Sequence, residues 1–478
     1  MEKRRTRRVA ILGGGPAGLS AACRLAGDRS SIRVDLYEQA PKFGGVVKSV
    51  KGGGFTYELG PNSMNAKHQA VADLIYEKLK LAPRIIKRDA EAKNFFLIRN
   101  GHMIALPRSP IDFCRTSLLS WPGKLRVLIE PFIPKASDGI ADRESVGDFF
   151  ARRFGNEFVD YVVDPALAGI YSAAPASLSM KHALHNVWQV ERKKGSIVGG
   201  FLSGGFKTEP DPRFKVYPKK ELLQSFSFDE GMEVLTSTLV EKIRAWSSGN
   251  KLYKNTKVRK LDQDANGAWR VNGRGKYDAV ISTIPTHALS SITTNVGALE
   301  RGFKKLASRI NYSPVSVVVL GFDKSQVESR LDGFGVLLPA REEKKILGIN
   351  FTSSIYPQRA VDPNKVYLTV YLGGTRSPEM VSTPCDEVIQ TATKEVQQVL
   401  GVKGDPLYSD VKKWPKGIPL YFPGYDAALD TMAHMERRAP GLVLAGNYRD
   451  GVGVPDALLS GLKSAERVIE YLKITMPK

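Results

Sequence analysis

The stretch Val9-Ala10-Ile11-Leu12-Gly13-Gly14-Gly15-Pro16-Ala17-Gly18-Leu19-Ser20-Ala21-Ala22 decides the fold of this chain of 478 residues. An apolar run leads into a G-x-G-x-x-G turn, and a helical pattern follows. The first glycine of such a turn allows a tight bend, and the second lets the backbone approach a pyrophosphate. The third allows close packing of helix and strand, while the helix N-terminus faces the phosphates. The stretch therefore predicts the first unit of a dinucleotide-binding fold.

An acidic residue at the expected distance supports this interpretation. Glu38 closes the next expected strand, residues 32–37, and lies 20 residues after Gly18. A carboxylate at this position suits a ribose hydroxyl. The motif alone does not say which dinucleotide is bound.

Further glycine clusters favour FAD over NAD. Gly44-Gly45 and the turn at residues 60–63 offer backbone to an extended cofactor, which an NAD dehydrogenase does not need. Near the other end, residues 451–454 precede the last expected helix. Backbone N–H groups at a helix start stabilise the negative charge of a reduced flavin. A tight strand-to-helix turn without a ligand is the alternative for this last loop.

The charge balance favours anionic partners. Lys and Arg number 70 against 49 acids, a net charge of +21. A positive electrostatic field of this kind attracts nucleic acid, an anionic membrane surface or an acidic small molecule. General solubility is the alternative explanation of the charge. Because the sequence has no zinc-finger spacing and no RNA-recognition signature, we expect no nucleic-acid partner.

Cysteine usage and hydropathy narrow the class of protein. Cys23, Cys114 and Cys385 lie far apart, so we expect neither a metal site nor a disulfide framework. No window approaches 18 uninterrupted apolar residues, and the basic start leads directly into a strand. We therefore expect no spanning helix and no secretory signal.

The chain divides into alternating regions that predict an α/β fold. A Rossmann-type domain is expected from three pieces, 1–90, 225–290 and 437–478, with strands at 258–261, 269–271, 277–285 and 441–447 and a helix at 235–246. A helical domain is expected at 91–203, a connection at 204–224, and a mixed-sheet domain at 291–436. In that last domain the pattern from 305 to 435 predicts strands, at 315–321, 334–338, 347–351 and 366–372.

The helical region mixes apolar and basic residues at 112–119, 123–129 and 145–154. A helix of this kind can lie in a membrane interface. Packing of an ordinary amphipathic helix against a core is the alternative.

Several segments together resemble the superfamily of FAD-containing amine oxidases and porphyrinogen oxidases. The glycine turn, Gly44-Gly45, Gly60-Pro61-Asn62-Ser63 and Ala445-Gly446-Asn447 carry the general likeness. The segments Pro175-Ala176-Ser177-Leu178-Ser179-Met180, 195–200, 225–228, 333–339, and Trp414 with 419–421 narrow it to the protoporphyrinogen oxidases of the oxygen-dependent, plant type. The likeness covers nearly the whole chain, in order.

The resemblance implies FAD chemistry without a protein side chain as catalyst. Protoporphyrinogen IX would lose six electrons and six protons in three flavin turnovers, with oxygen as acceptor and hydrogen peroxide as product. We name no catalytic side chain and no metal ligand, because binding geometry is the proposed catalytic device. The residues implied to contact FAD are Gly13, Gly14, Gly15, Pro16, Ala17, Gly18, Glu38, Gln39, Val46, Gly60, Pro61, Asn62, Ser63, Val258, Trp414, Asn447, Val452, Gly453 and Val454.

The implied substrate contacts are Leu337, Tyr371 and two positions that depart from the family pattern. Asn94 stands where the family has an arginine that pairs with a propionate, and Asn350 replaces an apolar pocket residue. Losing a charged contact weakens a simple transfer of propionate recognition. Our hypothesis is that Lys93 or Arg99 compensates.

The resemblance also implies partners and a location. The family places its helical region against a membrane, so we expect a peripheral membrane protein, on the cytoplasmic face in a bacterium or on an organelle membrane in a eukaryote. A homodimer is a possible assembly. Oxidation of coproporphyrinogen III, a flavin amine oxidase or carotenoid desaturase activity, and a non-catalytic flavin-binding scaffold are the alternatives.

Overall fold

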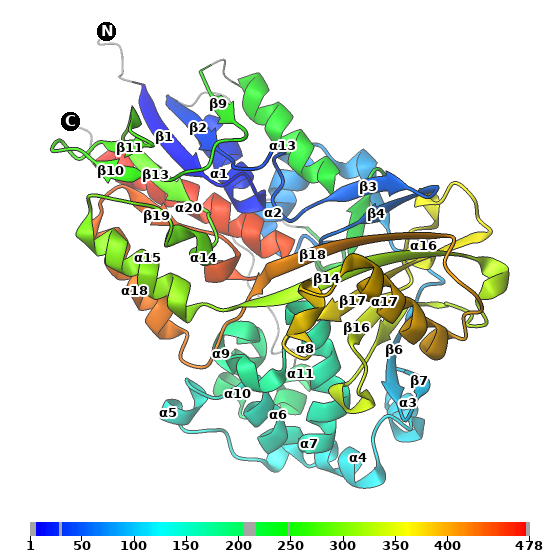
Figure 1. Ribbon diagram of the computed structural model, residues 1–478. Helices are drawn as coiled ribbons and strands as arrows, with labels where there is room; N and C mark the ends of the chain where they lie inside the picture. Colours follow the sequence, from blue (N-terminus) through cyan, green and yellow to red (C-terminus); the bar gives the residue numbers. More distant parts are fainter. Residues whose placement is uncertain (1–5, 28–30, 204–216, 247–248, 475–478) are drawn as a thin grey trace.

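The computed structural model describes residues 6–27, 31–203, 217–246 and 249–474. Figure 1 shows three regions: a parallel sheet with its helices at the upper left, a long mixed sheet through the middle, and a group of helices at the bottom. Most of the connection expected at 204–224 lies outside the described residues. Its end forms the short helix α12 (Lys219–Leu223).

The parallel sheet contains strands from all three expected pieces of the Rossmann-type domain. The order is β19-β13-β1-β2-β9, with the bounds Leu442–Leu444, Ala279–Ser282, Arg7–Leu12, Ile32–Tyr37 and Lys251–Tyr253. Every pair in it is parallel. Val9 to Leu12 are fully buried, as expected for an uninterrupted apolar strand covered on both faces.

Helices cover this sheet close to the glycine turn. α1 (Pro16–Ala26) begins directly after the turn and packs against α20 (Val454–Ile474) and α13 (Glu233–Trp246). A Cβ on Gly461 of α20 would collide with the carbonyl oxygen of Ala17, so the two helices touch backbone to backbone. The predicted order of strand, turn and helix is confirmed.

The mixed sheet has seven strands in the order β18-β14-β17-β16-β15-β6-β7. Their bounds are Tyr408–Pro419, Tyr312–Asp323, Lys365–Gly373, Ile346–Asn350, Gly333–Leu337, Asn94–Arg99 and His102–Ala105. Only the β15–β6 pair is parallel. α17 (Cys385–Leu400) covers one face with Val388, Ala392 and Val396. The four strands expected between residues 315 and 372 are confirmed.

The domain boundary expected at residue 91 differs from the structure. Residues 94–105 form β6 and β7 of the mixed sheet, and helices begin only at Pro110. The boundaries at 291 and 437 differ as well. α15 (Gly297–Arg309) and α18 (Asp426–Arg438) share a buried core with β19 and with Trp269, below the parallel sheet.

The helical region consists of short helices. They are α3 (Pro110–Arg115), α4 (Trp121–Leu128), η3 (Glu130–Phe132), α5 (Asp138–Ala141), α6 (Val146–Phe154), α7 (Asn156–Phe158), η4 (Val159–Val163), α8 (Asp164–Tyr171), η5 (Pro175–Ser177), α9 (Met180–Ala183), α10 (His185–Lys194) and α11 (Ile197–Leu202). The helix expected at 112–119 therefore ends at Arg115. Arg153, fully buried, joins Glu130 and Glu191 through ion pairs of 2.5 and 2.8 Å, which ties α6 to η3 and α10.

Smaller sheets connect these regions. β3 (Ser49–Gly52) pairs with β4 (Phe55–Glu58), and β5 (Ile85–Lys87) pairs with β8 (Phe226–Phe228). A third contains β10 (Leu261–Gln263), β11 (Trp269–Val271) and β12 (Arg274–Tyr277). The strand expected at 258–261 begins only at Leu261, and the one expected at 277–285 is divided between β12 and β13. The remaining helices are α2 (Gln69–Asp73), η1 (Leu74–Lys78), η2 (Ala82–Arg84), α14 (Thr286–Leu289), η6 (Lys324–Gln326), η7 (Ala340–Glu342), α16 (Thr352–Ile355), η8 (Pro357–Arg359), η9 (Pro378–Val381) and α19 (Asn447–Asp450).

Candidate functional site

The first glycine turn has the geometry that its sequence predicts. Gly13 has a φ of +103°, and a Cβ there would lie 2.6 Å from Thr283 Oγ1. A Cβ on Gly18 would collide with the Gly13 carbonyl. Glu38 is held beside this turn, because its Oε2 accepts a hydrogen bond of 2.8 Å from Gly14 N. The turn and the acidic residue thus form one local unit.

The Gly44-Gly45 doublet lies directly on this turn. Gly44 N donates to Gly14 O at 2.8 Å. A Cβ on Gly45 would lie 3.1 Å from the Cα of Gly15. The two glycine segments therefore form a cradle of bare backbone that any side chain would fill.

The segment around Val258 lies next to Glu38. Glu38 N donates to Tyr253 O, and Thr256 N donates to Glu38 O, both at 2.8 Å. Val258, two residues after Thr256, is buried, whereas Gln39 is exposed. The structure thus brings together the residues expected at the adenine and ribose end.

The C-terminal loop lies at the same edge of the parallel sheet as the glycine turn. Because all strands of this sheet are parallel, β1, β2, β13 and β19 end at one edge, at Leu12, Tyr37, Ser282 and Leu444. Ligands of such folds bind outside the carboxyl ends of the strands. Asn447 begins α19 there, and Val452 and Gly453 lead into Val454, the first residue of α20.

An ion-paired aspartate, Asp456, lies in the first turn of α20. Asp456 lies near Gly453 and accepts hydrogen bonds from Lys67 Nζ at 3.0 Å and from His68 Nε2 at 2.8 Å. Burial acts to raise the pKa of Asp456, but its partners lower it below the usual value, the hydrogen bond from His68 most. The carboxylate therefore stays ionised and paired.

Residues 60–63 lie between the parallel sheet and the mixed sheet. A Cβ on Gly60 would collide with the carbonyl of Val46, so these two expected residues touch. Trp414 Nε1 on β18 donates to Leu59 O at 2.7 Å. Asn62 Nδ2 donates to the hydroxyl of Tyr371 on β17.

The strand register places three of the four expected substrate residues on one face of the mixed sheet. Leu337 lies opposite Gly348, and Gly348 lies opposite Tyr371. Asn350 is two residues beyond Gly348 and so shares its face. Its Nδ2 lies 3.4 Å from the Tyr371 hydroxyl. Since Gly348 has no side chain, Leu337 and Tyr371 face each other across bare backbone.

This face carries an unsatisfied polar atom. Asn62 is 9% exposed, and its Oδ1 is buried without a hydrogen-bond partner among the described residues. Such an atom costs free energy unless a donor reaches it. The Tyr371 hydroxyl beside it stays protonated, because burial raises its pKa. The site thus presents an acceptor that a ligand N–H or O–H could satisfy.

Asn94, the fourth expected substrate residue, lies elsewhere. Its strand alternates, so Asn94 shares the face of Phe96, which belongs to the core under α17. Its Nδ2 donates to Asp332 at 3.1 Å near the surface. Arg99, one of the two residues expected to compensate, is paired with Glu157 at 2.7 Å. Asn94 is therefore on the opposite face from Leu337. Arg99 is two residues beyond Leu97, which lies opposite Leu337, so Arg99 shares the Leu337 face, but its guanidinium is already bound to Glu157 of the helical region.

The family model of the flavin containing amine oxidoreductases matches residues 16–469. The chain belongs to this family. It is an oxidoreductase, and the family match confirms the expected flavin cofactor, which the dinucleotide-type turn specifies as FAD.

Relatives of nearly full length agree with the family. The chain is 35% identical over 493 residues to protoporphyrinogen oxidase 2 of Arabidopsis thaliana, covering 98% of this chain and 94% of the relative. It is 26% identical over 479 residues to coproporphyrinogen III oxidase of Bacillus subtilis, covering 97% and 98%. A solved structure from Exiguobacterium sp. 255-15 has the same fold, with a TM-score of 0.79 at 23% identity, covering 98% and 99%. The expected resemblance is confirmed.

The residues of this flavoprotein fit FAD. The glycine cradle can accept a pyrophosphate against backbone, with Glu38 positioned for a ribose hydroxyl. The loop before α20 lies at the same sheet edge, and residues 60–63 lie between that edge and the mixed sheet. These contacts extend along one path, as a long dinucleotide requires.

Sequence reasoning missed a buried ion pair beside the site. Glu58 and Arg359 are 3.1 Å apart, with side chains 0% and 1% exposed. Glu58 also accepts from Ser49 Oγ at 2.7 Å and from Met232 N at 2.9 Å. Burial raises the pKa of Glu58 to about 7, although Arg359 opposes this. A charged residue directly after an aromatic residue of a short strand, Phe55–Glu58, is the signal that could have found it.

A second buried pair holds the helical region on the mixed sheet. Asp164 at the start of α8 pairs with Arg376 at 2.6 Å, and Ala340 N donates to the same carboxylate oxygen at 2.8 Å. Arg376 also donates to Leu338 O at 2.6 Å. In the same interface, a Cβ on Gly169 would lie 3.1 Å from Leu337. The pair therefore fixes α8 against the strand that carries Leu337.

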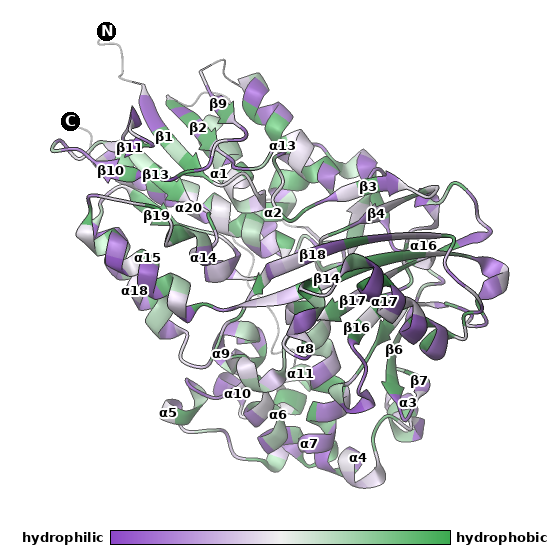
Figure 2. Ribbon diagram, viewed as in Figure 1, coloured by the Kyte–Doolittle hydropathy of each residue, from purple (hydrophilic) through white to green (hydrophobic). Residues whose placement is uncertain are grey.

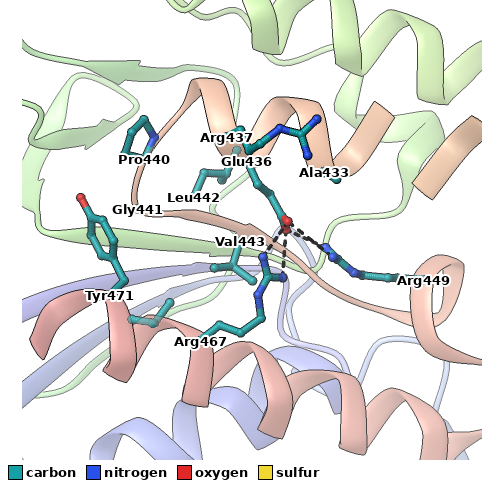
Figure 3. A pocket seen from close by; sticks show the side chains of 11 residues that line it. Ala433, Glu436, Arg437, Pro440, Gly441, Leu442, Val443, Arg449, Arg467 and Tyr471 are labelled. Carbon is teal, nitrogen blue, oxygen red and sulfur yellow. Dashed lines mark hydrogen bonds and ion pairs between the residues drawn. The ribbon is translucent and has the colours of Figure 1, made fainter. Parts of the chain in front are cut away.

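Other features of the described residues lie outside this site. A surface pocket of about 630 Å³ opens between α18, β19 and α20. In it Glu436 accepts hydrogen bonds from Arg449 and Arg467 (Figure 3). The pocket runs along β19, the edge strand of the parallel sheet, and none of the residues expected to contact FAD lines it. Within the ranges 6–27, 31–203, 217–246 and 249–474, no group of His, Cys, Asp and Glu could hold a metal ion, and no helix is long and apolar enough to cross a bilayer.

Proposed function

We propose that the chain is an FAD-dependent porphyrinogen oxidase that converts protoporphyrinogen IX into protoporphyrin IX, with oxygen as acceptor. The observation that carries this proposal is the Leu337–Gly348–Tyr371 face directly against residues 60–63. A large, mostly apolar macrocycle that carries pyrrole N–H donors fits a face with one unsatisfied acceptor better than a small cationic amine does. The two relatives named as porphyrinogen oxidases, both of nearly full length, support the same substrate class.

The overall reaction removes six hydrogens from the macrocycle. Three molecules of oxygen take up six electrons and six protons and leave as three molecules of hydrogen peroxide. FAD, when bound, supplies the two-electron acceptor in each of the three rounds. The protein contributes binding and orientation.

The chain's own residues position both partners. The glycine cradle and Glu38 would hold the dinucleotide, and the backbone amides at the start of α20 would stabilise negative charge on a reduced flavin. Gly348 lets the Leu337 side chain lie directly on its backbone, so that a pyrrole ring would bind against Leu337 and Tyr371. Asn62 Oδ1 accepts a hydrogen bond from a pyrrole N–H, which orients the macrocycle. Asn94, on the opposite face, takes no part in this arrangement, and Arg99 on the same face is engaged by Glu157.

The helical region is proposed to lie on a membrane. Trp121, Leu125 and Leu128 lie on one face of α4 and are 74%, 60% and 63% exposed, and Phe132 just beyond is 84% exposed. A helix face of large apolar side chains suits a lipid interface.

Flotation of the protein with anionic vesicles tests this proposal. The double substitution Leu125→Glu and Leu128→Glu should abolish the flotation. Flotation equal to wild type would contradict the proposal. A bacterial or organelle membrane and a homodimer stay predictions.

An anaerobic mixing experiment tests the proposed activity. Protoporphyrinogen IX is added to the yellow holoenzyme without oxygen. We expect the flavin absorption to bleach while porphyrin fluorescence appears. No bleaching would overturn the proposal, and peroxide release after readmission of air tests the acceptor.

Coproporphyrinogen III is the second candidate substrate, supported by the near-complete match to the Bacillus subtilis enzyme. It carries four propionates, whereas the strands that carry Leu337 and Tyr371 have no arginine, and Arg99 on the same face of β6 is already paired with Glu157. We therefore expect faster turnover of protoporphyrinogen. Parallel measurement of kcat/KM on the two substrates decides between them.

A further inference from the structure

Two helices outside the candidate site form an open groove. α15 and α18 lie side by side at the left of Figure 1, and the space between them measures about 580 Å³. Small residues keep the helices close: a Cβ on Gly302 would collide with Met435, and Ala298 and Ala427 line the groove as well. We call this feature the α15–α18 groove.

The α15–α18 groove is strongly basic. Arg301, Lys305, Arg309 and Arg437 line it, against the single carboxylate of Asp430. Within the part of the chain that the structure describes, none of these four cations forms an ion pair with an acid. Figure 3 shows Arg437 directed away from the cluster of Glu436, Arg449 and Arg467.

Nearby acidic side chains are already paired. Glu300 on α15 accepts from Lys304 at 2.8 Å, and Glu436 on α18 binds Arg449 and Arg467, both at 2.6 Å. Asp426 at the start of α18 is paired with Lys181 at 3.1 Å. The positive charge of the groove is therefore not neutralised from within.

The cations form a linear array. Arg301, Lys305 and Arg309 follow one another at four-residue intervals along α15, which places them about 6 Å apart on one helix face. His434 and Arg437 line the opposite wall, on α18. Carboxylates at the same four-residue interval on another helix would match this spacing.

We propose that the α15–α18 groove is a docking surface for an acidic helical segment of a partner protein. Small ligands require a site that buries most of their surface, whereas this groove is open along its length. A second copy of this chain is disfavoured, because a two-fold contact would bring the same cations face to face. The net charge of +21 would speed the approach of an acidic partner.

The groove differs in chemistry from the surface proposed to meet lipid. The large exposed apolar side chains of the helical region, such as Trp121 and Phe132, have no counterpart among the residues that line the groove. Two separate surfaces of one molecule are therefore assigned to two different kinds of partner.

Binding of a defined peptide tests the proposal. The probe is a fluorescein-labelled helical peptide with glutamate at every fourth position, and its anisotropy is followed during titration with the holoenzyme at low salt. We expect saturable binding that the double substitution Arg301→Glu and Lys305→Glu weakens at least about tenfold, since each reversed charge opposes a carboxylate. Lys394→Glu, an exposed lysine on α17, is the matched control and should leave the affinity unchanged.

Other probes separate the alternatives. The same variant should keep the flavin content and turnover of the wild type, because the groove lies outside the candidate site. Absence of saturable binding, or equal loss of affinity in the Lys394→Glu control, would overturn the proposal. Full displacement of the peptide by equimolar pyrophosphate, or groove-dependent binding to phosphatidylserine vesicles without peptide binding, would overturn it in favour of a small polyanion or a lipid.

Discussion

At the scale of single residues, the site depends on positions where a side chain is absent. Gly348 is the clearest example, because it separates Leu337 from Tyr371 on neighbouring strands. A Cβ there would lie 2.8 Å from Leu337 Cδ2 and 3.0 Å from Val336 O. The strand can accept alanine only by displacing Leu337 into the space that we assign to the macrocycle.

We predict that Gly348→Ala raises the KM for protoporphyrinogen at least about tenfold while flavin content stays unchanged. A loss of about 1.4 kcal/mol of binding free energy corresponds to such a change. Steady-state kinetics and the flavin-to-protein absorbance ratio check it. Gly139→Ala is the control, because a Cβ there has nothing within 4 Å. An unchanged KM in the Gly348 variant would exclude the ring from this position.

A buried charge gives the second prediction at this scale. The pKa of Glu58 lies near 7 in the folded protein, against 4.5 for an unperturbed glutamate, chiefly because it is buried. Between these values the unfolded chain has released the proton and the folded chain has kept it. The contribution of Glu58 to folding stability is therefore fully present below about pH 4.5 and is lost as pH rises towards 7.

Glu58→Gln should remove this dependence. The free energy of unfolding of wild type minus that of the variant should fall by on the order of 3 kcal/mol between about pH 4.5 and 7 and then level off. Chemical denaturation at several pH values measures it. Glu300→Gln is the control, since the pKa of exposed Glu300 is lowered by Lys304 and it titrates below this range. A difference that rises with pH would contradict the assignment.

At the scale of elements, the sequence pattern predicted the strands that contain a buried apolar run. β1, β14 and β17 each contain a buried apolar run and were predicted, whereas β18 was not. β18 contains three lysines and is an edge strand, and Figure 2 shows it mostly purple and white beside green β14. Its pairing with β14 overrides its weak pattern, which only long-range contacts reveal.

Some helices and some site residues were also missed from the sequence. α17 and most of α18 fall in the range 305–435, where strands and no helix were named, although Val388, Ala392 and Val396 of α17 recur at the four-residue spacing of an amphipathic helix. The glycine turn could be predicted, since its geometry is local. The positions of Asn94, Arg99 and Gly348 depend on strand register, which the sequence does not state. The same holds for Glu58 and Arg359, which meet across about 300 residues.

At the scale of the whole molecule, the site exists because separate regions are held together. The helical region meets the mixed sheet at α8, where Asp164 and Arg376 are paired with side chains 9% and 11% exposed. Glu58 and Arg359 join the β3–β4 hairpin to the segment after α16. Each buried pair costs desolvation, and removing one partner leaves an uncompensated charge.

We predict that Arg376→Leu lowers the free energy of unfolding by about 3 kcal/mol or more, because it strands the Asp164 carboxylate in the interface. It should also raise the KM for porphyrinogen, since α8 packs on Leu337. Denaturant unfolding and steady-state kinetics measure both effects. Arg376→Leu combined with Asp164→Asn should recover part of the stability, because no buried charge remains.

Lys304→Ala, which breaks an exposed pair on α15, is the control and should lower the free energy of unfolding by less than about 1 kcal/mol and leave the KM unchanged. If Arg376→Leu cost no more than Lys304→Ala, the pair would not be what fixes the helical region over the substrate face.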